Sequence, residues 1–195
     1  MEEQMADSPW EMWSAIGTVA AVFVALGISG QAAWANRRTE KDRSELAAAK
    51  MLSPLSALER KAAYLSVCFA FGESDFAEPG TNVLTAMEEI EALSKTISAE
   101  DLYPLLKLPR HAAKRSAKAL GLIQTSVSDI RAILAHPTWS DLKSSHKAMH
   151  YKRWWGMISE IQEHLAMAVA VCEAAAETGA PRPSPEEMYG GPSNE

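Results

Sequence analysis

Apolar residues recur along most of the chain at the three- and four-residue spacing of amphipathic helices, and no segment alternates as a strand does. One such stripe consists of Leu55, Leu58, Ala62, Leu65 and Phe69. A second consists of Ile158, Ile161, Leu165, Ala168 and Cys172. This pattern predicts an all-α protein, with an antiparallel bundle of about four helices.

Prolines, glycines and capping residues divide the pattern into elements. We predict helices over about 54–72, 82–97, 99–107, 110–135 and 139–177, within a bundle domain of 54–179. Ser98 with Asp101, and Thr138 with Asp141, have the spacing of capping boxes. Pro54 marks either a kink or the start of a new helix. The Pro- and Gly-rich tail, 180–195, is expected to be disordered.

One stretch departs from the amphipathic pattern. Residues 12–36 contain no charged side chain and lie between Glu11 and Arg37. A helix of this length rises about 37 Å, more than the roughly 30 Å of a hydrocarbon core. We therefore predict an acidic leader over 1–11, a transmembrane helix over 12–36 and a juxtamembrane helical stalk over 37–53.

The flanks of this segment suit a membrane anchor and indicate its orientation. Amphipathic aromatic residues favour the interface, and basic residues favour the cytoplasmic side. The predicted anchor residues at the two ends are Trp10, Trp13, Trp34, Arg37 and Arg38. Since no Lys or Arg precedes residue 37, we expect the N-terminus outside the cell and the C-terminal domain in the cytoplasm.

Two other interpretations of residues 12–36 remain. A cleaved signal peptide would begin with basic residues, and this leader has only acidic ones. A buried core helix would need a large covering surface on every side. The segment is also rich in Gly, Ala and Ser, so it is only moderately hydrophobic.

Small residues recur every fourth position within the segment, which lets two membrane helices approach closely. They are Gly17, Ala21, Ala25, Ser29 and Ala33. Because about half of the segment is small, such a series also arises by chance. Association of this helix with a second copy is therefore a hypothesis.

Composition narrows the class of protein. The formal net charge of −6 comes from the leader and the tail, since residues 37–177 hold equal numbers of acidic and basic side chains. This balance argues against nucleic-acid binding. Cys68 and Cys172 are far apart and fall in predicted helices, so we expect two reduced, buried thiols.

Residues 143–155 interleave basic and aromatic side chains, as surfaces that bind lipid, protein or nucleic acid can do. The candidate interaction surface is Lys147, Tyr151, Lys152, Arg153, Trp154 and Trp155. The simpler interpretation puts one tryptophan in the core and the other side chains in water. Residues 73–101 are also mostly acidic and 107–118 basic, which predicts either contacts within the bundle or a charged contact with a partner.

No catalytic or metal-binding motif is visible. His146 and His150 have the spacing of half a metal site, but no further ligand accompanies them. We expect no cofactor and no enzymatic activity.

The leading hypothesis is a single-pass membrane protein whose cytoplasmic bundle binds another protein or a second copy of the chain. The alternatives are an envelope structural or lysis-type protein that acts by oligomerisation, and a membrane-tethered enzyme with an unrecognised site.

Overall fold

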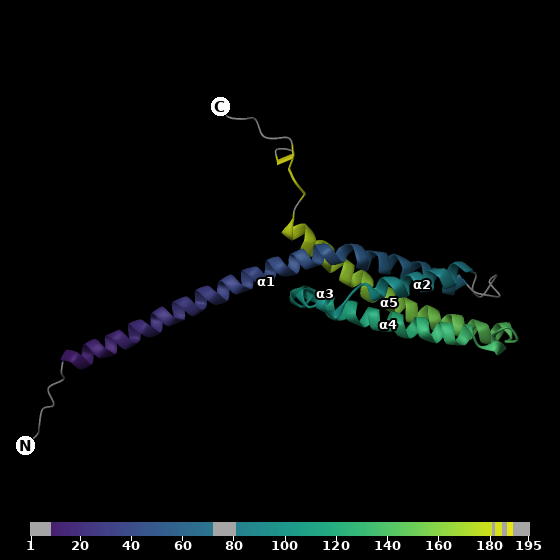
Figure 1. Cartoon of the computed structure of the whole chain (residues 1–195), viewed down its shortest axis with the longest axis horizontal. Coiled ribbons are helices and arrows are strands. Elements are labelled where there is room, and N and C mark those ends of the chain that lie inside the picture. Colours follow the sequence, from purple (N-terminus) through teal and green to yellow (C-terminus); the bar gives the residue numbers. More distant parts are fainter. Residues whose placement is uncertain (1–8, 72–80, 181, 185–186, 189–195) are drawn as a thin grey trace, which may run out of the picture. The chain divides into compact units, whose positions relative to one another are not determined.

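The secondary structure is entirely helical wherever the computed structural model describes the chain, which confirms the all-α prediction. The described backbone covers residues 9–71, 81–180, 182–184 and 187–188, and the described side chains are the same except for 9–20, 32, 81 and 82. The elements are α1 (Pro9–Phe71), α2 (Thr81–Lys95), α3 (Ala99–Leu102), η1 (Pro104–Lys107), η2 (Pro109–His111), α4 (Ala112–Leu134), η3 (Pro137–Trp139) and α5 (Ser144–Gly179) (Figure 1). Two compact units meet in sequence after Lys41.

Helix α1 passes through Pro54 without ending. A proline inside a helix costs about 3 kcal/mol because it removes one backbone hydrogen bond and crowds the preceding turn. Leu55 and Leu58, which follow it, are fully buried. Their packing offsets the local cost, so the chain does not begin a new helix at this point.

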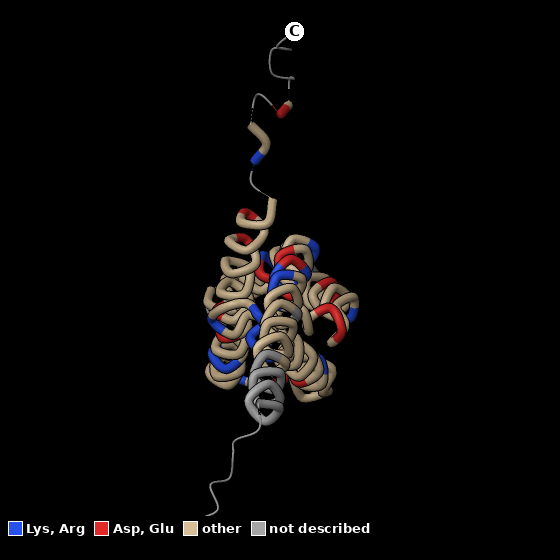
Figure 2. The backbone as a smooth tube through the Cα atoms, turned by 90° about the vertical axis from the view of Figure 1, so that its left-hand side faces the viewer, with Lys and Arg blue, Asp and Glu red and all other residues tan. Residues whose placement is uncertain are grey.

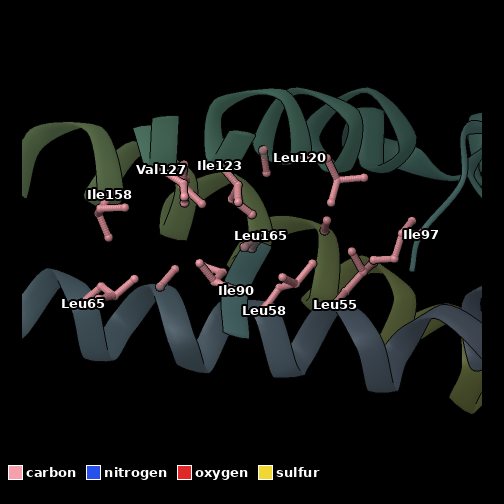
Figure 3. Packing of buried hydrophobic residues seen from close by; sticks show 14 of the residues in the cluster. Leu55, Leu58, Leu65, Ile90, Ile97, Leu120, Ile123, Val127, Ile158 and Leu165 are labelled. Atoms are coloured by element: carbon pink, nitrogen blue, oxygen red, sulfur yellow. The ribbon is translucent and has the colours of Figure 1, made fainter. Parts of the chain in front are cut away.

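The core of the second unit is built from apolar stripes on the long helices. In Figure 3, Leu58 and Leu65 of α1 point toward Ile123 and Val127 of α4 and Ile158 of α5. Both stripes predicted from the sequence are buried along their whole length. The core also takes in Ser44, Ala48 and Met51, which lie in the segment predicted as a stalk. The bundle therefore begins earlier along α1 than residue 54.

Only one of the two predicted capping boxes forms. The Asp101 amide donates to Ser98 Oγ at 3.2 Å, and the Ser98 amide donates to Asp101 Oδ2 at 3.1 Å. The prediction for Thr138 and Asp141 is wrong, since the Thr138 amide donates instead to His136 Nδ1 at the start of η3. Helix α5 consequently begins at Ser144 rather than near residue 139.

Two ends of the bundle can be told apart by their contacts. Lys50 Nζ lies 2.9 Å from Asp101 Oδ1, and Gly179 lies beside Glu45. We call this the entry end, because α1 enters the bundle there, next to α3 and the last turn of α5. At the opposite, far end, Phe69 packs against Tyr151 near the start of α5.

Candidate functional site

The first feature of functional interest is the apolar part of α1. Every side chain described between residues 21 and 43 is exposed. The large apolar ones are between 53% and 70% exposed: Val22, Phe23, Val24, Leu26, Ile28 and Trp34. No part of the described chain covers them. A helix segment this rich in apolar side chains is therefore left without an apolar environment.

These apolar side chains surround the helix axis. At 3.6 residues per turn, successive residues are rotated by about 100°, so residues 22, 23, 24, 26 and 28 spread over about two thirds of the circumference, and the small apolar residues Ala21 and Ala25 lie on the remaining third. A helix that packs on a protein surface normally shows one apolar stripe and a polar opposite face. This segment has no polar face.

The predicted anchor and association residues are only partly described. Trp34 is exposed, and the guanidinium carbon of Arg38 lies 5.9 Å from the centre of its ring. Arg37 is also exposed. Ala21, Ala25, Ser29 and Ala33 are exposed. The side chains of Trp10, Trp13 and Gly17 lie outside the described residues.

Within the described residues, no helix combines the length and the apolar character needed to cross a membrane. The predicted span starts at Met12, and the side chains of residues 12–20 lie outside the described ones. The transmembrane assignment thus stays a prediction.

The second feature is a cluster of aromatic rings at the far end of the bundle. Trp154 is fully buried, with ring centroids of Phe69, Trp139, His150 and Tyr151 between 5.5 and 5.8 Å away. Tyr151 is only 4% exposed. The prediction that Tyr151 and Trp154 lie on an interaction surface is therefore corrected, since both belong to the core.

A signal in the sequence could have found these two residues. Continuing the stripe of Ile158 and Ile161 backwards by four and then three positions gives Trp154 and Tyr151. The basic neighbours obscure this periodicity in the sequence. Lys152 and Arg153 stand between the two buried rings, but their side chains are on the exposed side of the helix.

The remaining candidates occupy different environments. Lys147 Nζ lies 5.4 Å from the Trp139 ring centroid, where a cation is attracted by the aromatic face. Arg153 lies 3.3 Å from Asp129 Oδ1, and Lys152 is exposed. Trp155 is 44% exposed. Of the six residues predicted to form an interaction surface, Lys152, Arg153 and Trp155 are exposed.

His146 and His150 have different surroundings. His150 packs against the rings of Trp139 and Trp154, while His146 is exposed. Across the described residues, no group of three or more His, Cys, Asp or Glu side chains could hold a metal ion.

Several charged residues of the acidic and basic stretches form ion pairs within the bundle. Glu91 of α2 contacts Arg131 of α4 at 2.7 Å and Lys95 at 2.6 Å, and hydrogen bonds from Lys95 and Arg131 lower its pKa. Lys118 contacts Glu160 of α5 at 2.6 Å. Figure 2 shows the two signs intermingled over the bundle helices.

The two cysteines are free thiols. Burial raises the pKa of Cys172 to about 11, so this side chain is a thiol at neutral pH and a poor nucleophile. Cys68 is half-buried beside Tyr64, and their hydrogen bond raises the pKa of the tyrosine.

Two open hollows mark the bundle surface. One, of about 380 Å³, is lined at the far end by Leu84, Leu134, Ala135, His136, Pro137, Trp139 and Ser140. The other, of about 430 Å³, lies between α1 and α2 and is lined by Ala57, Arg60, Lys61, Tyr64 and Leu93. Neither brings together an acid, a base and a nucleophile. Comparison with protein-family models, curated proteins and solved structures found no match to this chain.

Proposed function

We propose that this chain is a single-pass membrane protein, in which the apolar part of α1 is the anchor and the helical bundle binds another protein or a second copy of the chain. The observation that carries the proposal is the run of exposed, charge-free apolar residues around the whole circumference of α1. Such a helix requires an apolar environment on all sides.

Lipid fits this requirement better than a protein partner does. A partner helix covers one stripe of about a third of the circumference, and the other apolar side chains would stay in water. Hydrocarbon chains cover every side. The segment 12–36 also has tryptophans at both ends and no charge within it, as a membrane span does.

The basic flank suggests the orientation. Arg37 and Arg38 follow the apolar segment directly, and the residues before it include no Lys or Arg. The positive-inside rule then assigns the bundle to the cytoplasm. The free thiols of Cys68 and Cys172 suit that reducing compartment.

Extraction of membranes at alkaline pH tests the anchor. In the full chain, Val24→Arg with Ile28→Arg puts two charges near the middle of the segment, at a cost of about 2.5–3.5 kcal/mol each. We expect the wild type in the membrane pellet and the double variant released. The matched control is Leu46→Arg with Ala49→Arg, because these exposed residues lie on the same helix outside the segment. Release of the wild type, or equal retention of both variants, would contradict the proposal.

The exposed part of the predicted interaction surface is the best candidate for the partner contact. Tryptophan is enriched among residues that dominate binding energy at interfaces, and Trp155 lies on the same face of α5 as the exposed Lys152, three residues earlier. A photo-cross-linking residue at position 155 of the membrane-embedded chain should give one discrete adduct. The same residue at the exposed position 173 should give none. Equal labelling at both positions would contradict this assignment.

A further inference from the structure

An exposed patch with mixed chemistry lies at the entry end of the bundle, between α3 and α4. Tyr103 is 64% exposed and Leu106 is 53% exposed. Arg110, His111 and Lys114 follow and are exposed as well. We call these five residues the entry-end patch.

The local fold turns these side chains outward. Leu102 of α3 and Leu105 of η1 are buried, so these two short elements are held to the core while Tyr103 and Leu106 are exposed. Arg110 and His111 have left-handed backbone conformations, with φ of 54° and 58°. Arg115 Nε donates to the Arg110 carbonyl at 3.0 Å and supports this conformation.

The charge of the patch is not neutralised nearby. Across the described residues, Arg110, His111 and Lys114 form no ion pair. No Asp or Glu occurs between residues 102 and 128. Of the acids just before, Asp101 is already paired with Lys50, which leaves Glu100 as an exposed carboxylate. The patch therefore combines a positive charge with exposed aromatic and aliphatic groups.

This combination is typical of surfaces that lie in a membrane interface. Basic side chains are attracted to anionic headgroups at roughly 1 kcal/mol each near the surface, and apolar side chains enter the boundary with the acyl chains. An acidic protein surface or a nucleic acid would also attract the cations. Neither explains the exposed Leu106, which gains most from an apolar environment.

Only a short connection along the chain joins this end of the bundle to the proposed anchor. Ser44, the first buried residue of the bundle, lies eight positions after Asn36, the last residue of the proposed span. Eight residues of helix rise about 12 Å. This short connection limits how far the entry end can lie from the proposed anchor, whereas the aromatic far end lies at the other end of the long helices.

Building on the proposed anchor, we propose that the entry-end patch binds anionic phospholipid headgroups of the membrane in which α1 is anchored. Arg110, His111 and Lys114 contact the headgroup phosphates, and Tyr103 and Leu106 enter the interface. This second contact fixes the bundle against the membrane instead of leaving it attached through α1 alone.

Hydrogen exchange of the full chain in lipid nanodiscs tests this proposal. The discs contain either phosphatidylcholine alone or phosphatidylcholine with phosphatidylglycerol. Amides of residues 103–114 should exchange several-fold more slowly in the anionic discs. This difference should shrink when salt is raised from about 0.05 M to about 0.5 M, since salt screens exposed charges.

Two triple variants separate the patch from a general charge effect. Leu106→Ser with Arg110→Gln and Lys114→Gln should abolish the difference between the two lipids. The control, Met149→Ser with Lys143→Gln and Lys152→Gln, likewise removes one apolar side chain and two positive charges, but at the far end, and should keep the difference. All six residues are exposed, and circular dichroism of both variants verifies that the bundle is folded.

The possible failures are distinguishable. A chain that does not enter nanodiscs at all overturns the proposed anchor. A chain that enters both kinds of disc but exchanges equally fast in them overturns the lipid contact and leaves the anchor standing. Slow exchange of residues 103–114 that is identical in both lipids also overturns it, and assigns the patch to a contact between copies of the chain.

Discussion

At the scale of single residues, Trp154 organises the far end of the bundle. Its ring is fully buried and packs against four other rings. Its Nε1 finds no hydrogen-bond partner among the protein groups described. Packing, and not a polar contact, is therefore what this side chain contributes.

This predicts a clear order of stability among substitutions. Trp154→Ala should lower the free energy of unfolding by about 3–5 kcal/mol, because it leaves a large cavity. Trp154→Phe should cost clearly less, since most of the ring volume stays and no hydrogen bond is lost. Urea unfolding of the full chain in mild detergent, followed by circular dichroism, measures both. Trp155→Ala is the control and should change the free energy by no more than about 0.5 kcal/mol. An equal loss for positions 154 and 155 would show that the ring cluster is not part of the core.

The Asp101 carboxylate, at the entry end, makes the stability of the fold depend on pH. Hydrogen bonds from Lys50 and Ser98 lower its pKa from the ordinary value of 3.8 to about 2. A carboxyl group with a depressed folded-state pKa stabilises the fold above its unfolded pKa, and this contribution is lost as the pH falls through the folded value. Its stabilising effect should therefore be complete above about pH 4 and decline toward pH 2.

The comparison of wild type with Asp101→Asn tests this dependence. At pH 7 the variant should be less stable, and the difference should narrow as the pH falls from about 4 to about 2. Thermal unfolding at a series of pH values gives the measurement. A difference that stays constant over this range would mean that the charge of Asp101 does not stabilise the bundle.

At the scale of helices, three glycines have different surroundings. A Cβ at Gly121 of α4 or at Gly156 of α5 would meet nothing within 4 Å. A Cβ at Gly179 would lie 2.9 Å from Glu45 Cβ, which is closer than van der Waals contact allows. The last turn of α5 thus approaches α1 so closely that only glycine fits.

Alanine substitution should stabilise the protein at two of these glycines and destabilise it at the third. Gly121→Ala and Gly156→Ala should each stabilise the protein by about 0.5–1 kcal/mol, because alanine loses less backbone entropy in a helix. Gly179→Ala should destabilise it and loosen the contact between α5 and α1. Thermal unfolding of the three variants measures the change in stability that each substitution causes. Stabilisation by Gly179→Ala would contradict the close approach at the entry end.

Periodicity predicted the helices well where apolar stripes are long. Helix α2 was expected over 82–97 and α4 over 110–135, and they span Thr81–Lys95 and Ala112–Leu134. Local rules failed where packing or a competing turn decided the outcome. Pro54 stays inside α1 because buried leucines follow it, and η3 replaces the first turn predicted for the last helix.

At the scale of the whole molecule, the bundle and the apolar segment differ in whether other described parts of the chain bury their apolar side chains. The bundle buries its own stripes, so its core could be predicted from spacing alone. The side chains described between residues 21 and 43 are all exposed, so the described part of the chain supplies no core for them. The proposed bilayer is the medium that matches an apolar surface on every side.

The topology of the full chain tests the central claim most directly. Paired reporters at the C-terminus, one active only in the cytoplasm and the other only outside it, would be assayed in membrane and soluble fractions. We predict activity of the cytoplasmic reporter in the membrane fraction. Activity of the external reporter would contradict the orientation, and activity of the cytoplasmic reporter in the soluble fraction would contradict the membrane anchor itself.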